Sequence, residues 1–253
     1  MTPFPVVLSI PHGGTAVPVE LQGRVSLDRH GIHDDSDPFV REMYDLGGRV
    51  AEVISTDIAR AFVDLNRAPD DLPPANPDGL VKTLTCVGQP IYTPGKELDA
   101  RLIARLIDTY YTPYHARLER AVSKPGLALG IDCHSMLPVG PPIGPDTGQP
   151  RPMICVGNVR GRACPMGLAE RFAACLCSAF CLEPHQVSLN QPFGGGYITR
   201  TYGGNPVPWL QVEMNRALYL DPPWFERRTL SMDPARLQEL NAQFATAVAD
   251  FFA

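Results

Sequence analysis

Two short apolar runs, each followed by a histidine, constrain this chain more than any other feature. Residues 6–10 lead into His12, and residues 127–131 lead into Asp132 and His134. Apolar runs of this length predict strands that are buried on both faces, as in a parallel sheet. Such sheets bind ligands just beyond the carboxyl ends of their strands. Two imidazoles at these ends therefore predict a metal site assembled from distant parts of the chain.

The remaining pattern predicts an α/β fold. Further strands are expected at residues 51–55, 61–65, 153–156 and 210–214, and helices at residues 38–46, 96–122, 165–180 and 234–252. Strands that alternate with helices predict a three-layer α/β/α domain with a mixed, mostly parallel sheet. Long loops are expected at residues 67–80, 136–151 and 189–208. Without a linker or repeat, the 253 residues are expected to form a single domain over 1–253.

Composition argues against several classes of partner. The net charge is −5 and there is no basic block, which disfavours nucleic-acid binding. No apolar run approaches the roughly 20 residues of a membrane helix, and the first residues lack the pattern of a secretory signal. A cytoplasmic location is the resulting expectation. The odd number of cysteines, seven, predicts reduced thiols that fill the core.

The two histidines have different local settings. His12 is followed by Gly13 and Gly14, so alone it fits a turn-capping histidine as well as a metal ligand. His134 lies two residues after Asp132, and strand periodicity places both side chains on one side of the chain. An aspartate in that position orients a metal-binding imidazole. The Asp-x-His pattern therefore favours a ligand role for His134.

An acidic cluster at residues 34–37 offers a third ligand. Its aspartates precede Pro38, so they also fit the N-cap of a helix. One carboxylate can bind a metal while a neighbour caps the helix, and Asp35 and Asp37 alternate along the chain. The residues alone do not choose between these two. His30 and His33 are weaker candidates.

Two segments carry arginines suited to an acidic substrate. Asn66 and Arg67 follow the strand expected at 61–65, and a guanidinium matches a carboxylate in shape and charge. The alternative is a salt bridge from Arg67 to Asp64 or Asp70. Arg200 ends a glycine-rich segment that is a poor phosphate loop, because it lacks a Lys-Ser/Thr pair and a helix directly behind it. We interpret that segment as a mobile loop over the substrate.

Glu213 is a candidate for proton transfer. It lies among apolar residues in the strand expected at 210–214, and burial there raises the pKa of a carboxyl toward the range of a general base and acid. The alternative is an exposed glutamate on an edge strand, paired with Arg216. Nucleophilic catalysis is disfavoured, because no Gly-x-Ser-x-Gly occurs and Cys133 and His134 point to opposite faces of a strand.

A series of motifs in a fixed order extends along most of the chain. The segments are PHGG at 11–14, DDSD at 34–37, FVDLNR at 62–67, GQPIYTPG at 88–95, YYTPYH at 110–115, IDCHS at 131–135, FGGGYITRTYG at 193–203 and QVEMNRALY at 211–219. In these segments the chain resembles the N-formylglutamate amidohydrolase family. That family is similar to the zinc carboxypeptidases and aspartoacylases, so the resemblance implies a zinc-exopeptidase-like (phosphorylase/hydrolase-like) fold.

The resemblance also implies roles for individual residues. His12 and His134 become zinc ligands, and Glu213 becomes the catalytic acid and base. Asn66 and Arg67 become substrate binders. The acidic ligand of the relatives lies three residues after the first histidine, where this chain has Ala16. The third ligand must come from elsewhere, and Asp35 is our first choice, with Asp37 second.

Together these features predict a metal-dependent hydrolase with one divalent ion, zinc first. The implied reaction splits the formamide of N-formyl-L-glutamate into L-glutamate and formate, a step of histidine degradation, through a zinc-bound water and Glu213. Arg67 and Arg200 are expected to hold the substrate carboxylates. Two alternatives stay open: a related amidase or carboxypeptidase acting on another N-acyl amino acid or a cell-wall peptide, and a metal-free dicarboxylate-binding protein. A monomer or small homo-oligomer without nucleic-acid or membrane partners is expected.

Overall fold

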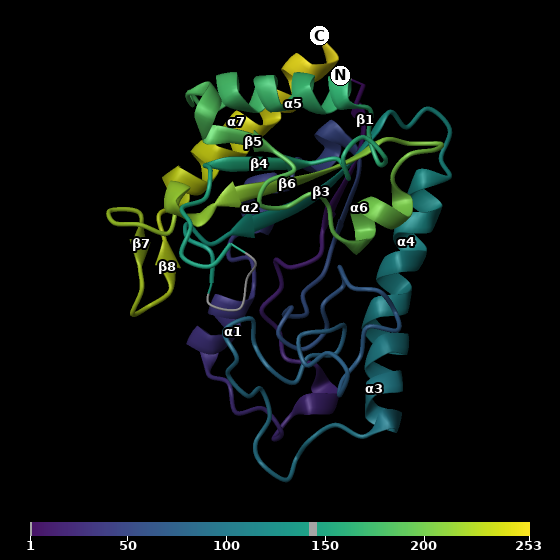
Figure 1. Ribbon diagram of the computed structural model, residues 1–253, viewed down its shortest axis with the longest axis vertical. Coiled ribbons are helices and arrows are strands. Elements are labelled where there is room, and N and C mark those ends of the chain that lie inside the picture. The colour runs from purple at the N-terminus through teal and green to yellow at the C-terminus, as the bar shows by residue number, and fades with distance from the viewer. Residues whose placement is uncertain (1, 142–145) are drawn as a thin grey trace.

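The computed structural model describes residues 2–141 and 146–253, and a six-stranded sheet with the order β2-β1-β3-β6-β4-β5 lies at its centre (Figure 1). The strands are β1 (Phe4–Ile10), β2 (Val50–Ser55), β3 (Leu129–Met136), β4 (Ile154–Gly157), β5 (Val187–Leu189) and β6 (Trp209–Asn215). Strands β2, β1, β3 and β6 run parallel to one another. Strand β4 runs antiparallel to β6 and parallel to β5. The predicted mixed, mostly parallel sheet is confirmed.

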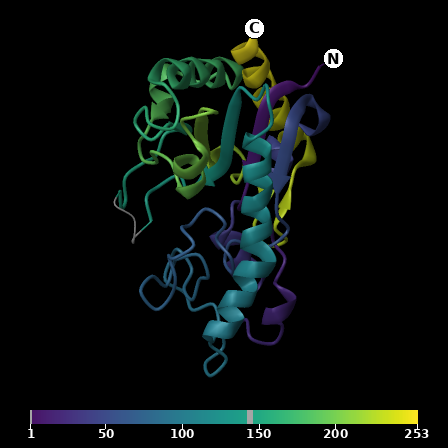
Figure 2. The same cartoon turned by 90° about the vertical axis from the view of Figure 1, so that its right-hand side faces the viewer.

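Helices cover both faces of the sheet. The helices on one face are α2 (Val40–Tyr44), α5 (Met166–Ala179) and α7 (Pro234–Phe252). The opposite face carries α6 (Tyr197–Tyr202) and a long helix made of α3 (Ala100–Leu106), a π-helical turn (Ile107–Tyr111) and α4 (Thr112–Val122). Figure 2 shows the long helix passing the sheet on the side away from α5, beside loops from the first hundred residues. The sheet is thus the middle layer of an α/β/α arrangement.

Successive side chains along each strand point to opposite faces of the sheet. Leu129, Ile131 and Cys133 of β3 point into the core beneath α2, α5 and α7. The residues between them, including Asp132 and His134, point to the opposite face. At the carboxyl end of the central strands this second face is polar. The fold therefore separates an apolar core from a polar pocket across the same strands.

Several elements differ from the sequence prediction. Residues 61–65 form turns rather than a strand, because their backbone N–H groups bond within loops, as Asp64 N does with Leu80 O at 2.7 Å. Helix α6 lies in the stretch predicted as a loop at 189–208. Helix α1 (Arg29–Asp35), strand β5 and the hairpin of β7 (Phe225–Glu226) and β8 (Ser231–Met232) had no clear sequence signal. Residues 142–145 of the loop predicted at 136–151 lie outside the described residues.

Helix starts are predicted better than loops. Asp233 caps α7 by accepting from the N–H of Ala235 at 2.8 Å, and Pro234 takes the first helical position as predicted. The helix predicted from residue 96 begins at Ala100, where Asp99 accepts from the N–H of Leu102 at 2.7 Å. Residues 67–80 contain no helix or strand. No described helix has the length and apolar character needed to cross a membrane.

Candidate metal centre and active site

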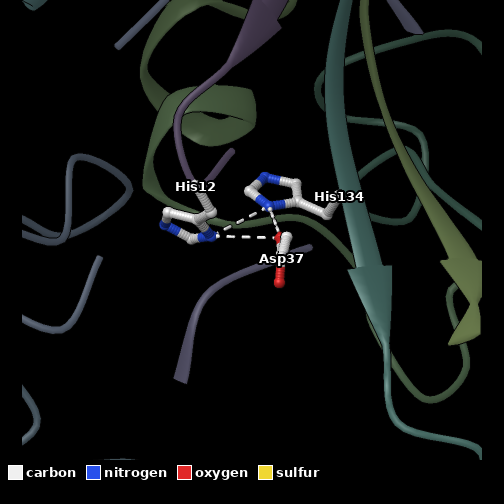
Figure 3. A group of neighbouring side chains, drawn as sticks. All are labelled: His12, Asp37 and His134. Carbon is white, nitrogen blue, oxygen red and sulfur yellow. Dashed lines mark hydrogen bonds and ion pairs between the residues drawn. The ribbon is translucent and has the colours of Figure 1, made fainter. Parts of the chain in front are cut away.

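Three potential metal ligands from distant parts of the chain converge at one point (Figure 3). His12 follows β1, His134 lies on β3, and Asp37 lies in the turn after α1. Nδ1 of His134 lies 3.1 Å from Nδ1 of His12 and 3.1 Å from Oδ2 of Asp37. Nδ1 of His12 lies 3.4 Å from the same oxygen. All three side chains are buried, so the group forms a closed cluster on the polar face of the sheet.

The other nitrogen of each imidazole contacts a buried carboxylate. Nε2 of His134 lies 2.9 Å from Oδ2 of Asp132, and Nε2 of His12 lies 2.7 Å from Oδ1 of Asp64. A carboxylate in this position accepts the Nε2 proton, so the lone pair of Nδ1 faces the centre. The Asp-x-His pattern indicated Asp132. Asp64 was missed, because it is 52 residues from His12 and lies in a segment predicted as a strand.

The chemistry of these three atoms fits a cation. With both Nε2 protons directed to carboxylates, two imidazole lone pairs and a carboxylate oxygen face one another, and acceptors alone repel. Burial lowers the pKa of His134, but Asp132 and Asp37 outweigh burial and hold this pKa well above its usual value. The surroundings thus favour a positive charge at this point. Two imidazoles and one carboxylate are a known ligand set for zinc with a further position open.

Asp37 is held in place by two donors besides the histidines. Arg216 Nη2 donates to Oδ1 of Asp37 at 3.1 Å, and the backbone N–H of Ser135 donates to Oδ2 at 3.3 Å. Burial raises the pKa of Asp37, but its contacts with His12 and His134 hold the value well below the usual range. Asp37 is therefore a charged and oriented carboxylate.

Asp35, the aspartate preferred from the sequence, does not join this group. Its Oδ2 accepts from Lys82 Nζ at 2.7 Å and its Oδ1 from the backbone N–H of Cys86 at 2.6 Å. The expectation that Asp35 and Asp37 point the same way assumed an extended chain. Helix α1 instead runs through Asp35 and ends there, so the two side chains diverge. The structure places Asp37, the second choice, with the histidines.

Glu213 reaches the same region from β6. It is the register partner of His134 on the adjacent strand and lines a cavity of about 200 Å³ together with the three clustered ligands. Its exposed fraction is 6%, and burial raises its pKa to about 7. The alternative of an exposed edge-strand glutamate paired with Arg216 is wrong, because β6 lies between β3 and β4 and Arg216 bonds to Asp37.

Asn66 supports the centre through its contact with Asp132. Its Nδ2 donates to Oδ2 of Asp132 at 2.9 Å, and its Oδ1 accepts from the N–H of Ile198 at 2.7 Å. A Cβ added to Gly196 would lie 2.5 Å from Asn66 Nδ2, so only glycine fits there. Asn66 lines the cavity, and its Nδ2 also lies 2.9 Å from Nε2 of His134, beside the same Asp132 oxygen. Both ends of its amide are therefore used inside the protein.

Two arginines, one of them unforeseen, share a carboxylate beside the centre. Arg67 Nε donates to Oδ2 of Asp64 at 3.2 Å, and Arg60 Nε donates to the same oxygen at 3.0 Å. Both line the cavity, and the side chain of Arg60 is 17% exposed against 32% for Arg67. Arg67 thus makes the predicted salt bridge and also faces the cavity. The only sequence signal for Arg60 was its spacing of four residues from Asp64.

Arg200 lies apart from this cavity. Its side chain is exposed on α6, whereas the cavity is lined by His12, Asp37, Arg60, Asp64, Asn66, Arg67, His134, Ser135, Phe193, Gly196, Gln211 and Glu213. The glycine-rich segment before α6 leads directly into a helix, contrary to the prediction. The structure brings most of the predicted residues together and leaves out Arg200 and Asp35.

Comparison with known proteins decides the family. The sequence model of the N-formylglutamate amidohydrolase family matches residues 4–220, a span that contains every residue of the site. This chain belongs to that family. An N-formylglutamate deformylase of Pseudomonas aeruginosa is 30% identical over 226 residues, covering 86% of this chain and 82% of the relative. A second, from Pseudomonas putida, is 27% identical over 229 residues, with the same coverage. Family membership identifies an enzyme of the amidohydrolase type.

The fold comparison agrees with this assignment. The crystal structure of an N-formylglutamate amidohydrolase from Ralstonia eutropha superimposes with a TM-score of 0.76 and 23% identity. The match covers 98% of this chain and 94% of that chain. The family's α/β architecture is therefore present along the whole described sheet.

Proposed function

We propose that this enzyme is a metal-dependent hydrolase that splits N-formyl-L-glutamate into L-glutamate and formate. The observation that carries the proposal is the cluster of His12, Asp37 and His134, which shares one small cavity with buried Glu213. The names of both Pseudomonas relatives, N-formylglutamate deformylase, support the substrate. Zinc, a place in histidine degradation, a cytoplasmic location and one catalytic domain over residues 1–253 belong to the same proposal.

The ligand set defines what a bound ion contributes. His12, His134 and Asp37 would hold the ion, with Asp64, Asp132 and Arg216 orienting them. Bound there, a divalent ion would lower the pKa of a water molecule and polarise the formyl oxygen. This ligand set replaces the one with Asp35.

Glu213 performs the proton transfers in this mechanism. As a carboxylate it takes a proton from the attacking water while the oxygen of that water bonds to the formyl carbon. It then gives the proton to the amine nitrogen as the carbon–nitrogen bond breaks, which releases formate and glutamate. A pKa of about 7 suits both steps, because the group gains and loses a proton near neutral pH.

Arg60 and Arg67 have different roles in this mechanism. Arg60 is the more buried, and its bond to Asp64 ties it to His12, so we assign it to the negative oxygen that develops on the formyl carbon. Arg67 is the more exposed, and we assign it to a substrate carboxylate. Asn66 holds Asp132 rather than substrate. Arg200 is left without a role in binding.

Cavity size favours a small substrate over the open alternatives. The volume of about 200 Å³ is below the roughly 300–1,000 Å³ of pockets for drug-sized ligands. A formylated amino acid suits this space better than a cell-wall peptide. The converging acceptors at the centre favour a metal enzyme over a metal-free dicarboxylate-binding protein.

Formate release from N-formyl-L-glutamate tests the proposal. We expect activity that a chelator removes and zinc restores, and a loss of about 10²–10⁴-fold in kcat for Glu213→Gln. Bound metal without formate release would direct the search to other acyl amino acids. Dicarboxylate binding with neither metal nor turnover would overturn the proposal.

A further inference from the structure

Gln211 connects the segment before α6 with Glu213. It lies on β6 two residues before Glu213, and strand periodicity turns both side chains toward the cavity. Its Oε1 accepts from the backbone N–H of Gly196 at 2.5 Å, and its Nε2 donates to Oε1 of Glu213 at 2.7 Å. Gln211 is itself buried. Both ends of the amide are therefore used inside the protein.

The backbone of Gly196 decides which end of the amide faces Glu213. A backbone N–H can only donate, so it requires the carbonyl oxygen of Gln211 as its partner. The NH₂ group must then face Glu213, where it meets a carboxylate oxygen that accepts. The orientation is thus set by a main-chain group that no side-chain rotation can reverse.

The segment that supplies this N–H is fixed independently. Gly196 packs directly against Asn66, and Ile198 N donates to Oδ1 of Asn66 at 2.7 Å. Gln211 is therefore anchored to a part of the backbone that is itself tied to the wall of the site. The glycine-rich segment thus links Gln211 to Asn66 through its backbone.

This support leaves one oxygen of Glu213 free. Oε1 is bonded to Gln211, while the residues that the structure describes give Oε2 no hydrogen-bond partner. We propose that Gln211 is a positioning residue, which holds Glu213 in the rotamer from which Oε2 exchanges protons with the water and the leaving amine. This inference rests on the proposed function and assigns no contact between Gln211 and substrate.

Two substitutions separate the two ends of the amide. Gln211→Met removes both hydrogen bonds with little change in size. Gln211→Glu keeps an acceptor for the Gly196 N–H and replaces the amide donor with a second carboxyl, which repels the charge of Glu213 and raises its pKa. Gln186→Met is the matched control, because the Gln186 amide oxygen also accepts a backbone N–H, that of Glu183 at 2.9 Å, on the far edge of the sheet.

We expect both Gln211 variants to lose about 10²-fold in kcat, the cost of a small misplacement of a reacting group, with KM and bound zinc unchanged. Gln186→Met should match the wild type. A wild-type kcat in either Gln211 variant would overturn the inference. A parallel rise in KM or loss of zinc would overturn it too, since it would indicate general damage to the site.

A second measurement tests the role of Gln211 independently of the proposed function. The ¹³C signal of the Glu213 carboxyl, assigned with Glu213→Gln, should shift in both Gln211 variants and stay in place in Gln186→Met. If the wild type releases no formate, the proposed function fails, and this signal still decides whether Gln211 positions Glu213. An unshifted signal would contradict the positioning contact whatever the substrate.

Discussion

The two faces of the central sheet follow opposite rules. Beneath α2, α5 and α7, residues such as Leu8, Ile131 and Val212 make an apolar core. On the other face, at the carboxyl ends of the same strands, Asp132 and Glu213 are buried and hydrogen-bonded. Buried polar groups cost free energy unless they are paired, whereas apolar burial stabilises the fold directly. The second face also packs an apolar core beneath α3, α4 and α6, so the chemistry is confined to its carboxyl end.

The largest expected effect lies on the apolar face. Phe244 of α7 is fully buried and packs edge-on against Tyr44, with ring centroids 4.8 Å apart. Phe244→Ala should lower the free energy of unfolding by about 3–5 kcal/mol, because it removes buried area and leaves a cavity. Denaturant titration measures this loss. The kcat of the folded variant should stay at the wild-type value, and a matching fall in kcat would erase the distinction between the faces.

The same division explains what the sequence could predict of the fold. Strands β1 and β3 begin with short apolar runs, and β6 alternates apolar residues with Gln211 and Glu213. Helix α7 has both a cap and a periodic apolar side, so local pattern was sufficient for these elements. Residues 61–65 are equally apolar, yet they pack as turns in the second core. An apolar run indicates that a segment is buried, but it does not indicate whether the backbone pairs with a neighbouring strand.

For the site, prediction depended on sequence distance. Asp132 lies two residues from His134, and strand periodicity was enough to relate them. Asp64 reaches His12, and Gln211 reaches Gly196, only through the tertiary fold. The choice between the two aspartates of the acidic cluster depended on where α1 ends, and helix ends are placed poorly by sequence pattern. Local pairs were therefore predictable, and the supporting network was not.

The next largest effect is expected on metal affinity, when a carboxylate that contacts a metal ligand on the polar face is changed. Asp64→Asn leaves the shape of the site but replaces the carboxylate that accepts the Nε2 proton of His12. Metal affinity should fall about 10–100-fold, as expected when a partner of a ligand is changed. Competition with a chromogenic chelator measures this affinity. Asp132→Asn should act alike through His134, whereas Asp57→Asn, at an exposed salt bridge with Arg41, is the control without effect.

A fall in affinity for Asp57→Asn as large as that for Asp64→Asn would show that general charge, rather than the oriented contact with His12, sets metal binding. Unchanged affinity in both Asp64→Asn and Asp132→Asn would remove the reason for assigning the facing lone pairs to a cation. Either result would require a different account of the polar face.

A smaller effect is expected for the pH dependence of kcat/KM. Burial raises the pKa of Glu213 to about 7, and the group must be unprotonated to take the proton of water. The value of kcat/KM should therefore rise with pH and fall about tenfold per unit below this pKa. A bound cation stabilises the carboxylate and moves this limb to lower pH. Stopped assays of formate between pH 5 and 8 would locate the limb, and a flat profile would contradict the role of Glu213.

The smallest expected change in kinetics is that of Arg200, which the sequence predicted as a substrate binder and which lies outside the cavity. Arg200 is exposed on α6, so Arg200→Ala should change kcat/KM by no more than about twofold, the range of an ordinary surface substitution. Arg67→Ala, inside the cavity, should raise KM much further, and Arg67→Lys should recover only part of the loss because lysine lacks the planar fork. Steady-state kinetics with N-formyl-L-glutamate compares the three variants. An equal rise in KM for Arg200→Ala and Arg67→Ala would mean that α6 approaches the cavity when substrate binds. In that case the segment before α6 would cover the substrate, as expected from the sequence, and Arg200 would belong to the polar face.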